Sequence, residues 1–458
     1  MKIRSSCVFL GGFFSCVGLG GGIAPLGAAV AGASVNAPAA AAGAESWMQW
    51  RGPTRDGKVA GTAWPARLGP EVLRAGWRVA LGPSYSGPIV AGDLVYVTET
   101  LDKSQEMVRA LDRRTGREVW RHGWAGAMSV PFYAKSRGDW IRATPATNGD
   151  LVFVAGMKDV LVAMDARTGQ ERWRVDFAKQ FGTGVPDFGL VCSPLLDGDA
   201  IFIQAANSTV KLKQATGEIV WRALPGKGGA GSSGAFSSPV LATLHGQRQL
   251  VVQSREQLAG IDPESGAVGW TQPVPSFRGM NILTPTVVGD AVFTSSYQNR
   301  SWLFTIAKAD GAINVREAWS NNAQGYMSSP IVIGGYAYLH MGNQRFTCID
   351  LKTGTRVWSS DSFGKYVSMV AQGDRILALD ERGILLLIKA DPKGFELLDQ
   401  RKVADEDTWA HLAVCGDEIF VRELRGVATF RWQETTVATT DASLGPRGSL
   451  SSGVAAGQ

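Results

Sequence analysis

One eleven-residue phrase recurs along this chain and restricts its possible folds more than any other feature. In most copies the third residue is Asp, and in all of the clearest copies the seventh is Gly and the last is Trp; these copies are residues 110–120, 163–173, 211–221, 260–270 and 348–358. Self-similarity of this kind is typical of repeat architectures, in which each small unit buries its apolar face against its neighbours. The chain is therefore expected to consist of copies of one supersecondary unit.

The recurring residue types each have a structural explanation. Gly can adopt the positive φ that closes a β-hairpin, and a carboxylate four residues earlier can accept the backbone N–H groups of that turn. The Trp would lie on the next strand, where its ring can cover a neighbouring unit. We therefore expect a structural role, rather than a catalytic or cofactor-binding one, for Asp112, Gly116, Trp120, Asp165, Gly169, Trp173, Gly217, Trp221, Asp262, Gly266, Trp270, Asp350, Gly354 and Trp358.

A second element precedes the phrase in most units. It consists of a small residue, Pro, a few apolar residues, a turn that is usually Gly-Asp, and an alternating strand, as in residues 87–97, 144–154, 193–203, 284–293 and 329–339. Together the two elements predict four short antiparallel strands per unit, which is the composition of a propeller blade.

Two further copies are degraded, around Gly311 and Gly394, and a last pair of strands ends at Trp432. The sequence thus predicts an all-β, eight-bladed β-propeller with four-stranded antiparallel blades over residues 72–432. The last unit has only three strands of its own. We expect the strand around Trp77 to complete it, because joining the first and last strands in one sheet removes the open edges of the ring.

The two ends of the chain differ in composition from the repeats. In residues 1–44, Lys2 and Arg4 precede an apolar run and then an Ala/Gly-rich stretch with small-residue cleavage sites, which predicts a signal peptide. An uncleaved anchor and a lipidated Cys16 are the alternatives. The protein is expected to be exported to the periplasm or the cell surface, with residues 45–71 as an N-terminal extension and residues 433–458 as a disordered tail.

Composition excludes several classes of function. The formal net charge is only +5, so no nucleic-acid partner is expected. Cys192, Cys348 and Cys415 lie in apolar, strand-like contexts and are predicted to be buried thiols rather than disulfide or metal positions. The His residues lack ligand spacing, so no metal site is predicted. We expect a monomer that contacts membranes only peripherally.

The Ala-x-Asp-x-x-Thr-Gly-x-x-x-Trp phrase resembles the tryptophan-docking repeat of pyrroloquinoline-quinone (PQQ) propellers, over roughly residues 72–432. That family includes quinoprotein dehydrogenases, with PQQ and Ca²⁺ at the axis, and cofactor-free members such as the BamB-type subunit of outer-membrane protein assembly. Residues 47–53 are similar to the start of a large exported PQQ-repeat group of unassigned role. The dehydrogenase resemblance implies adjacent cysteines and an axial Glu, Asn and Asp; this chain has no Cys-Cys pair, and we match no residues to those three.

The segments that lead into each inner strand are expected to line one face of the central channel. Aromatic, cationic and amide residues in these segments form a candidate rim for a peptide or a planar ligand, comprising Tyr85, Trp140, Arg142, Phe188, Phe236, Asn281, Tyr326, Tyr366, Trp409 and His411. The alternative is that the aromatic rings only fill gaps in the funnel. The insertion at residues 121–140 escapes the repeat and is a second candidate for specificity.

These features lead us to expect an exported, non-catalytic scaffold that binds an envelope protein or peptide, or a small ligand at the propeller axis, without a cofactor. The alternative is a PQQ- and calcium-dependent dehydrogenase that oxidises an alcohol or sugar. A hydrolytic or polysaccharide-handling propeller is a third class. No catalytic residue is assigned under any of them.

Overall fold

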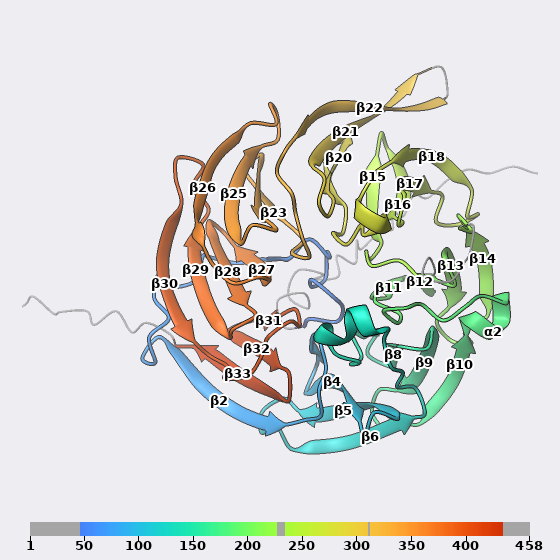
Figure 1. The fold of residues 1–458 in the computed structure, drawn as a ribbon. Helices are drawn as coiled ribbons and strands as arrows, with labels where there is room; N and C mark the ends of the chain where they lie inside the picture. Colours follow the sequence, from blue (N-terminus) through green and yellow to red (C-terminus); the bar gives the residue numbers. More distant parts are fainter. Residues whose placement is uncertain (1–45, 227–233, 310–311, 434–458) are drawn as a thin grey trace, which may run out of the picture. The chain divides into compact units, whose positions relative to one another are not determined.

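Eight antiparallel sheets surround a common axis in this computed structural model (Figure 1). The structure describes residues 46–226, 234–309 and 312–433, so the predicted leader and all but the first residue of the predicted tail lie outside the described residues. The eight-bladed propeller predicted from the repeats is confirmed.

Each blade runs from an inner strand near the axis to an outer strand at the rim. Blade 1 contains β3 (Ile89–Ala91), β4 (Leu94–Leu101), β5 (Gln105–Asp112) and β6 (Glu118–Trp124), and blade 2 contains β7 (Ala146–Thr147), β8 (Leu151–Gly156), β9 (Val160–Asp165) and β10 (Glu171–Asp176). Blade 3 contains β11 (Leu195–Asp197), β12 (Ala200–Ala205), β13 (Ser208–Lys213) and β14 (Ile219–Ala223), and blade 4 contains β15 (Val240–Leu244), β16 (Gln247–Gln253), β17 (Gln257–Ile261) and β18 (Val268–Pro273).

Blades 5 to 8 follow the same order, except that the outer strand of blade 8 comes from the start of the ring. Blade 5 contains β19 (Thr286–Val288), β20 (Ala291–Ser295), β21 (Ser301–Ala309) and β22 (Ala312–Asn321), and blade 6 contains β23 (Ile331–Ile333), β24 (Tyr336–His340), β25 (Arg345–Asp350) and β26 (Arg356–Ser362). Blade 7 contains β27 (Val367–Gln372), β28 (Arg375–Asp380), β29 (Ile384–Lys389) and β30 (Glu396–Lys402), and blade 8 contains β31 (Ala413–Cys415), β32 (Glu418–Glu423), β33 (Gly426–Trp432) and β2 (Leu73–Ala80). Short helices in the described residues are η1 (Phe132–Arg137), α2 (Phe177–Phe181) and η2 (Phe277–Gly279), and none of them has the length and apolar character needed to span a membrane.

Antiparallel pairing decides which connections share a face of the ring. The segments that enter the inner strands and the loops between second and third strands lie at one end of the blades, which we call the loop face. The turns between first and second strands and between third and fourth strands lie at the opposite end, the turn face. On the turn face, Asp112 accepts hydrogen bonds from the N–H (2.8 Å) and hydroxyl (2.6 Å) of Thr115.

The repeated Trp residues contact the next blade. The indole N–H of Trp120 donates to the carbonyl of Ala166 (2.9 Å), and that of Trp173 donates to the carbonyl of Gln214 (2.9 Å). A Cβ atom on Gly169 would lie only 2.4 Å from the Trp120 ring, and Gly169 also has a φ of +72°. Glycine is therefore required at this turn both by the backbone conformation and by the ring that lies on it.

Hydrophobic side chains form separate clusters between adjacent blades rather than one central core. Between blades 1 and 2 the cluster includes Ile89, Val108, Val152 and Val162. Equivalent clusters lie between the other blades, and the largest connects blades 7, 8 and 1. Each blade thus buries its two faces against its two neighbours, as repeat units do.

The ring closes in blade 8, where β2 pairs antiparallel with β33. The pairing joins Leu73 to Trp432, which confirms the closure predicted from the sequence. The indole N–H of Trp77 donates to the carbonyl of Arg113 (2.8 Å) in blade 1, so this seam uses the same Trp contact as the interior interfaces.

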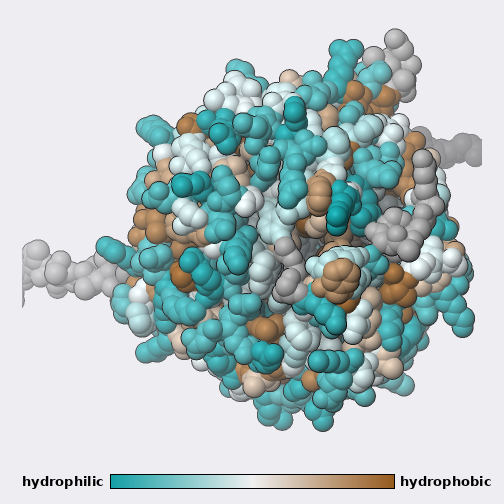
Figure 2. Space-filling model, viewed as in Figure 1, coloured by the Kyte–Doolittle hydropathy of each residue, from teal (hydrophilic) through white to brown (hydrophobic). Residues whose placement is uncertain are grey.

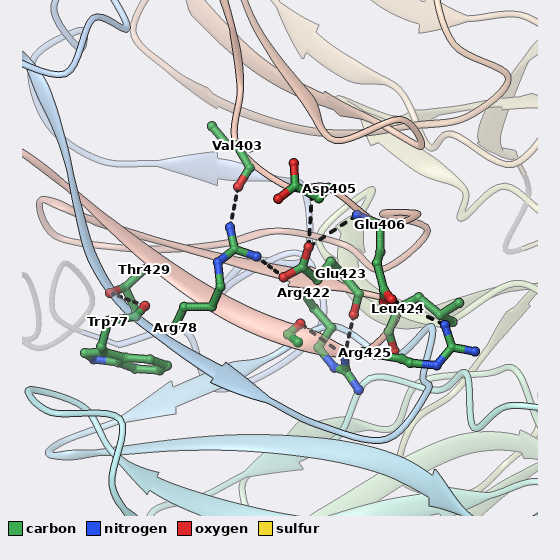
Figure 3. Close-up of polar contacts among 11 residues, drawn as sticks. Trp77, Arg78, Val403, Asp405, Glu406, Arg422, Glu423, Leu424, Arg425 and Thr429 are labelled. Atoms are coloured by element: carbon green, nitrogen blue, oxygen red, sulfur yellow. Dashed lines mark hydrogen bonds and ion pairs between the residues drawn. The ribbon is translucent and has the colours of Figure 1, made fainter.

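Polar contacts reinforce this seam (Figure 3). Arg78 forms an ion pair with Glu423 and donates to the carbonyl of Val403 (2.9 Å). The other carboxylate oxygen of Glu423 accepts the N–H groups of Asp405 (3.2 Å) and Glu406 (3.4 Å). One side chain from β32 thereby connects the first strand of the ring to the segment between blades 7 and 8.

The N-terminal extension is built into the ring in a way that the repeats did not predict. β1 (Lys58–Val59) pairs parallel with the inner strand β27, which makes the sheet of blade 7 five-stranded instead of four-stranded. Earlier in the extension, Trp47 and Val90 of blade 1 exchange two backbone hydrogen bonds (2.8 and 3.0 Å), and Arg55 donates to the carbonyl of Pro194 in blade 3, which lies opposite blade 7 in the ring. Residues 47–59, which we call the channel segment, therefore cross the propeller axis.

Candidate binding funnel on the loop face

A cavity of about 540 Å³ opens at the axis on the loop face. Its lining comes mainly from segments that precede the inner strands, together with Trp50 of the channel segment. Because the channel segment crosses the axis beneath it, the cavity is a funnel with a floor rather than a through channel. We call it the axial funnel.

Seven of the ten rim residues predicted from the sequence line this funnel, and they are Tyr85, Arg142, Phe236, Tyr326, Tyr366, Trp409 and His411. The other three do not. Asn281 is fully buried, with its amide donating to the carbonyls of Arg255 (3.0 Å) and Val274 (2.8 Å). Phe188 contacts Phe236 from outside the funnel (5.5 Å between ring centroids), and Trp140 is partly exposed outside the lining.

Blades 7, 8 and 1 supply a continuous aromatic wall. Tyr366 and Trp409 stack with ring centroids 5.3 Å apart and an interplanar angle of 13°, and Tyr85 packs against Trp409 at 6.0 Å. The guanidinium of Arg142 lies 5.8 Å from the Tyr85 ring and donates to the carbonyl of Gly138 in the insertion. The insertion thus helps to hold one cation at the funnel wall.

Two further aromatic runs lie around the rest of the mouth. Tyr326 contacts Tyr297 (5.1 Å), which contacts Phe277 (6.1 Å), while Phe188 links Phe236 to Tyr133 (6.3 Å). We call the three runs together the aromatic collar, which consists of Tyr85, Trp409, Tyr366, Tyr326, Tyr297, Phe277, Phe236, Phe188, Tyr133 and Phe132.

The insertion carries the most exposed part of this collar. Phe132 is 86% exposed and Tyr133 is 54% exposed, and the Tyr133 hydroxyl donates to the Asp187 carboxylate (2.6 Å). In Figure 1 the short helical turn of the insertion, η1, drawn in teal, lies toward the centre of the ring. The space-filling view from the same side shows hydrophobic residues as separate patches in a mostly hydrophilic face (Figure 2).

Two guanidinium groups of the channel segment are buried in the floor. Arg51 and Arg55 are almost completely buried, and their guanidinium carbons lie 5.6 and 5.7 Å from the Trp50 ring centroid. Arg55 donates to the carbonyls of Pro194 (2.8 Å) and Ser193 (3.1 Å), and Arg51 donates to carbonyls including that of Pro330. Neither forms an ion pair with any carboxylate of the described residues.

Burial changes the protonation behaviour of the floor. Loss of solvent lowers the pKa of Arg51 and of Arg55 to about 10, which leaves both cationic at neutral pH. His411 contacts Trp50 edge to face (5.8 Å), and burial, with Arg51 nearby, lowers the pKa of its imidazole to about 3. The floor therefore presents two fixed positive charges and a neutral imidazole.

Within the described residues, the funnel lining does not bring together a cluster of carboxylates of the kind that calcium favours. The funnel lining contains two carboxylates, Glu381 and Asp407, and Glu381 accepts the N–H of Tyr366 (3.2 Å). Across the ranges that the structure describes, no three His, Cys, Asp or Glu side chains converge as a metal cluster would require. Cys192, which precedes β11, and Cys348 and Cys415, in β25 and β31, are buried thiols.

A family model described as outer membrane protein assembly factor BamB matches residues 104–360, more than half of the chain. The chain belongs to the BamB family. A BamB from Yersinia pestis is 23% identical over 265 residues, which cover 54% of this chain and 63% of that protein. The chain therefore spans less than two thirds of the length of that BamB relative.

Solved structures agree on the fold of this BamB-family chain. BamB from Moraxella catarrhalis superimposes with a TM-score of 0.59 at 15% identity, covering 79% of this chain and 98% of that one. A quinohemoprotein alcohol dehydrogenase from Comamonas testosteroni gives a TM-score of 0.61 at 14% identity, covering 86% of this chain and 81% of that one. At these identities the likeness concerns the propeller fold alone.

Proposed function

We propose that this chain is an exported, non-catalytic propeller that binds an envelope protein or peptide through the loop face. The observation that carries the proposal is the aromatic collar around a closed axial funnel. Exposed aromatic residues around a concavity are the residue type that dominates protein recognition sites. Membership of the BamB family, which is named for outer membrane protein assembly, favours a partner from that process and a location in the periplasm.

The test is affinity capture with purified protein and envelope extracts of the organism that encodes it. The wild-type protein is compared with a double variant, Tyr326→Ala and Trp409→Ala, which removes one ring from each of two collar runs. We expect a partner that takes part in outer membrane protein assembly, and we expect the variant to bind it at least about tenfold more weakly, since an interface anchor contributes about 2 kcal/mol or more.

A matched control keeps this test specific. Val357→Ala on β26 and Val268→Ala on β18 remove apolar side chains that are 43% and 42% exposed on outer strands, away from the collar. Capture should be unchanged for the control. Equal capture by the collar variant, with its thermal stability unchanged, would exclude the loop face as the binding surface.

The quinoprotein alternative has its own assay. Purified protein is incubated with PQQ and Ca²⁺, and dye-linked oxidation of alcohols and sugars is followed. Turnover that depends on both additions would replace the scaffold proposal with an enzymatic one. We expect no turnover, because no three His, Cys, Asp or Glu side chains converge among the described residues, and calcium sites are usually rich in carboxylates.

A further inference from the structure

Resting on the proposed function, we propose that the axial funnel selects an acidic, apolar-flanked segment of its partner polypeptide, with a carboxylate side chain directed toward the funnel floor. The charge and chemistry of the bound segment are inferred from the two buried cations of the floor and the exposed Lys365, together with the aromatic collar.

The floor of the funnel carries two buried cations. Arg51 and Arg55 donate to neutral carbonyls, and the buried Nε–H of each has no hydrogen-bond partner among the described residues. Neither forms an ion pair there, although the charge of Asp56 partly offsets that of Arg51. Their low-dielectric surroundings weaken screening of this charge. Both guanidiniums lie near the ring of Trp50, which lines the funnel, so the space above Trp50 is electropositive.

The wall adds further cations. Arg142 and Lys365 line the funnel, Lys365 is exposed, and no ion pair of Lys365 occurs within the described part of the chain. Arg382 also lines it, although its guanidinium pairs with the buried carboxylate of Asp380 (2.6 Å). Just outside, the guanidinium of Arg255 lies 5.2 Å from the Phe236 ring.

The lining carboxylates do not neutralise the floor. Glu381 lies in the loop between β28 and β29, where it accepts the N–H of Tyr366, and Asp407 precedes β31. Both belong to blades 7 and 8. Arg55 bonds to blade 3 on the other side of the axis, and no carboxylate among the lining residues comes from blades 1 to 6. A ligand carboxylate on that side would therefore meet cations.

The collar decides between a peptide and an acidic sugar. Four of its members, Phe132, Phe188, Phe236 and Phe277, have no polar group on the ring, so they favour apolar side chains over hydroxyl-rich rings. A volume of about 540 Å³ is of the size that a few side chains fill. An extended segment in which acidic and apolar residues alternate meets both requirements.

The experiment uses fluorescein-labelled twelve-residue peptides and the purified full chain. One peptide alternates Asp or Glu with Leu or Phe; a second replaces every acid by Asn or Gln; a third replaces every acid by Lys. Fluorescence anisotropy at low and high salt measures the dissociation constants. We expect the acidic peptide to bind at least about tenfold more tightly than the neutral one, with affinity that falls as salt rises, and the Lys peptide not to bind.

Charge-reversal variants locate the interaction. Lys365→Glu should weaken the acidic peptide by about tenfold and leave the neutral peptide unchanged. Lys352→Glu is the matched control, because Lys352 is an exposed lysine in the Asp350–Gly354 turn on the opposite face, and it should change neither. Thermal unfolding of each variant shows whether the ring is intact.

The outcomes separate this inference from the proposed function. If the partner is still captured through Tyr326 and Trp409 but acidic and neutral peptides bind equally, the charge selection is wrong and the scaffold function stands. If neither peptides nor partners respond to the collar substitutions, the proposed function itself is wrong. Tighter binding of an oligogalacturonate than of the acidic peptide would assign the funnel to acidic sugars and overturn the peptide inference.

Discussion

A Cβ atom on Gly116 would lie 2.7 Å from the indole ring of Trp77, across the seam where the first and last strands of the propeller meet. The φ of Gly116 is +73°, so both the backbone and the Trp ring require glycine here. We predict that Gly116→Ala lowers the free energy of unfolding by about 2–4 kcal/mol, measured by chemical denaturation.

Gly92 provides a matched control for this substitution. It has a φ of +55° in the turn between β3 and β4, and a Cβ atom there would meet nothing within 4 Å. Gly92→Ala should therefore lose only the backbone contribution of about 1 kcal/mol. Equal losses at the two positions would show that the Trp77 contact contributes nothing.

Glu106 should make stability depend on pH. It is fully buried between blades 1 and 2, where its carboxylate accepts the Trp124 indole N–H (3.0 Å) and the Met157 N–H (2.8 Å). Burial raises its pKa from 4.5 to about 7. The folded state therefore holds this proton more tightly than the unfolded state, so the contribution of Glu106 to stability is present below pH 4.5 and is lost as pH rises to about 7.

The size of this loss is of the order of 3 kcal/mol. In Glu106→Gln the loss of stability between pH 4.5 and 7 should be smaller by this amount, although one hydrogen bond weakens at every pH. Buried Asp159, whose pKa is also raised to about 7, keeps its own contribution. Glu317→Gln, a substitution at an exposed position on β22, should leave the pH dependence of the free energy of unfolding as it is in the wild type. The free energy of unfolding is measured by chemical denaturation across this pH range. If it changes with pH equally in the wild type and in Glu106→Gln, the raised pKa of Glu106 is wrong.

Trp270 does not make the hydrogen bond to the next blade that Trp120 and Trp173 make. Its indole N–H donates to the side-chain oxygen of Gln249 in its own blade (2.7 Å) rather than to a carbonyl of the next blade. Gln249→Met would leave this buried donor without its acceptor, so we predict a loss of about 1–3 kcal/mol in denaturation experiments. Gln272→Met, which removes a hydrogen bond to the Pro273 carbonyl in an exposed setting, should cost less than about 0.5 kcal/mol.

The channel segment should be important for stability despite lying outside the repeats. Trp47 is buried against Gly52 and its backbone pairs with Val90. We predict that Trp47→Ala lowers the free energy of unfolding by about 3–5 kcal/mol. Val119→Ala on the outer strand β6, 47% exposed, should change it by less than about 0.5 kcal/mol. A small effect of Trp47→Ala would show that the ring holds without this segment.

The repeats carry enough information to predict the blades, their number and the closing strand. Most of the repeated Trp residues lie on the turn Gly of the next copy, as Trp120 lies on Gly169, so the pattern itself encodes the contact. Trp77 and Gly116 make the same contact across the seam, which is why closure could be predicted.

The path of the channel segment could not be predicted, because residues 47–59 occur once and bond to blades that are distant in sequence. Arg55 donates to Pro194, and nothing in the local sequence marks that carbonyl as its acceptor. The position of a residue in its blade also did not fully predict whether its side chain lines the funnel. Asn281 precedes an inner strand, as Tyr326 does, yet its amide turns inward to two carbonyls while Tyr326 lines the funnel.

The seam also has a consequence for biogenesis. Arg78 and Glu423 are 345 positions apart, and they meet only in blade 8. While the chain is still emerging from a ribosome or a translocon, β2 has no partner and the channel segment has no finished ring to cross. Such a chain remains an open arc with two unsatisfied edges, so chaperone protection would be needed until β33 is delivered.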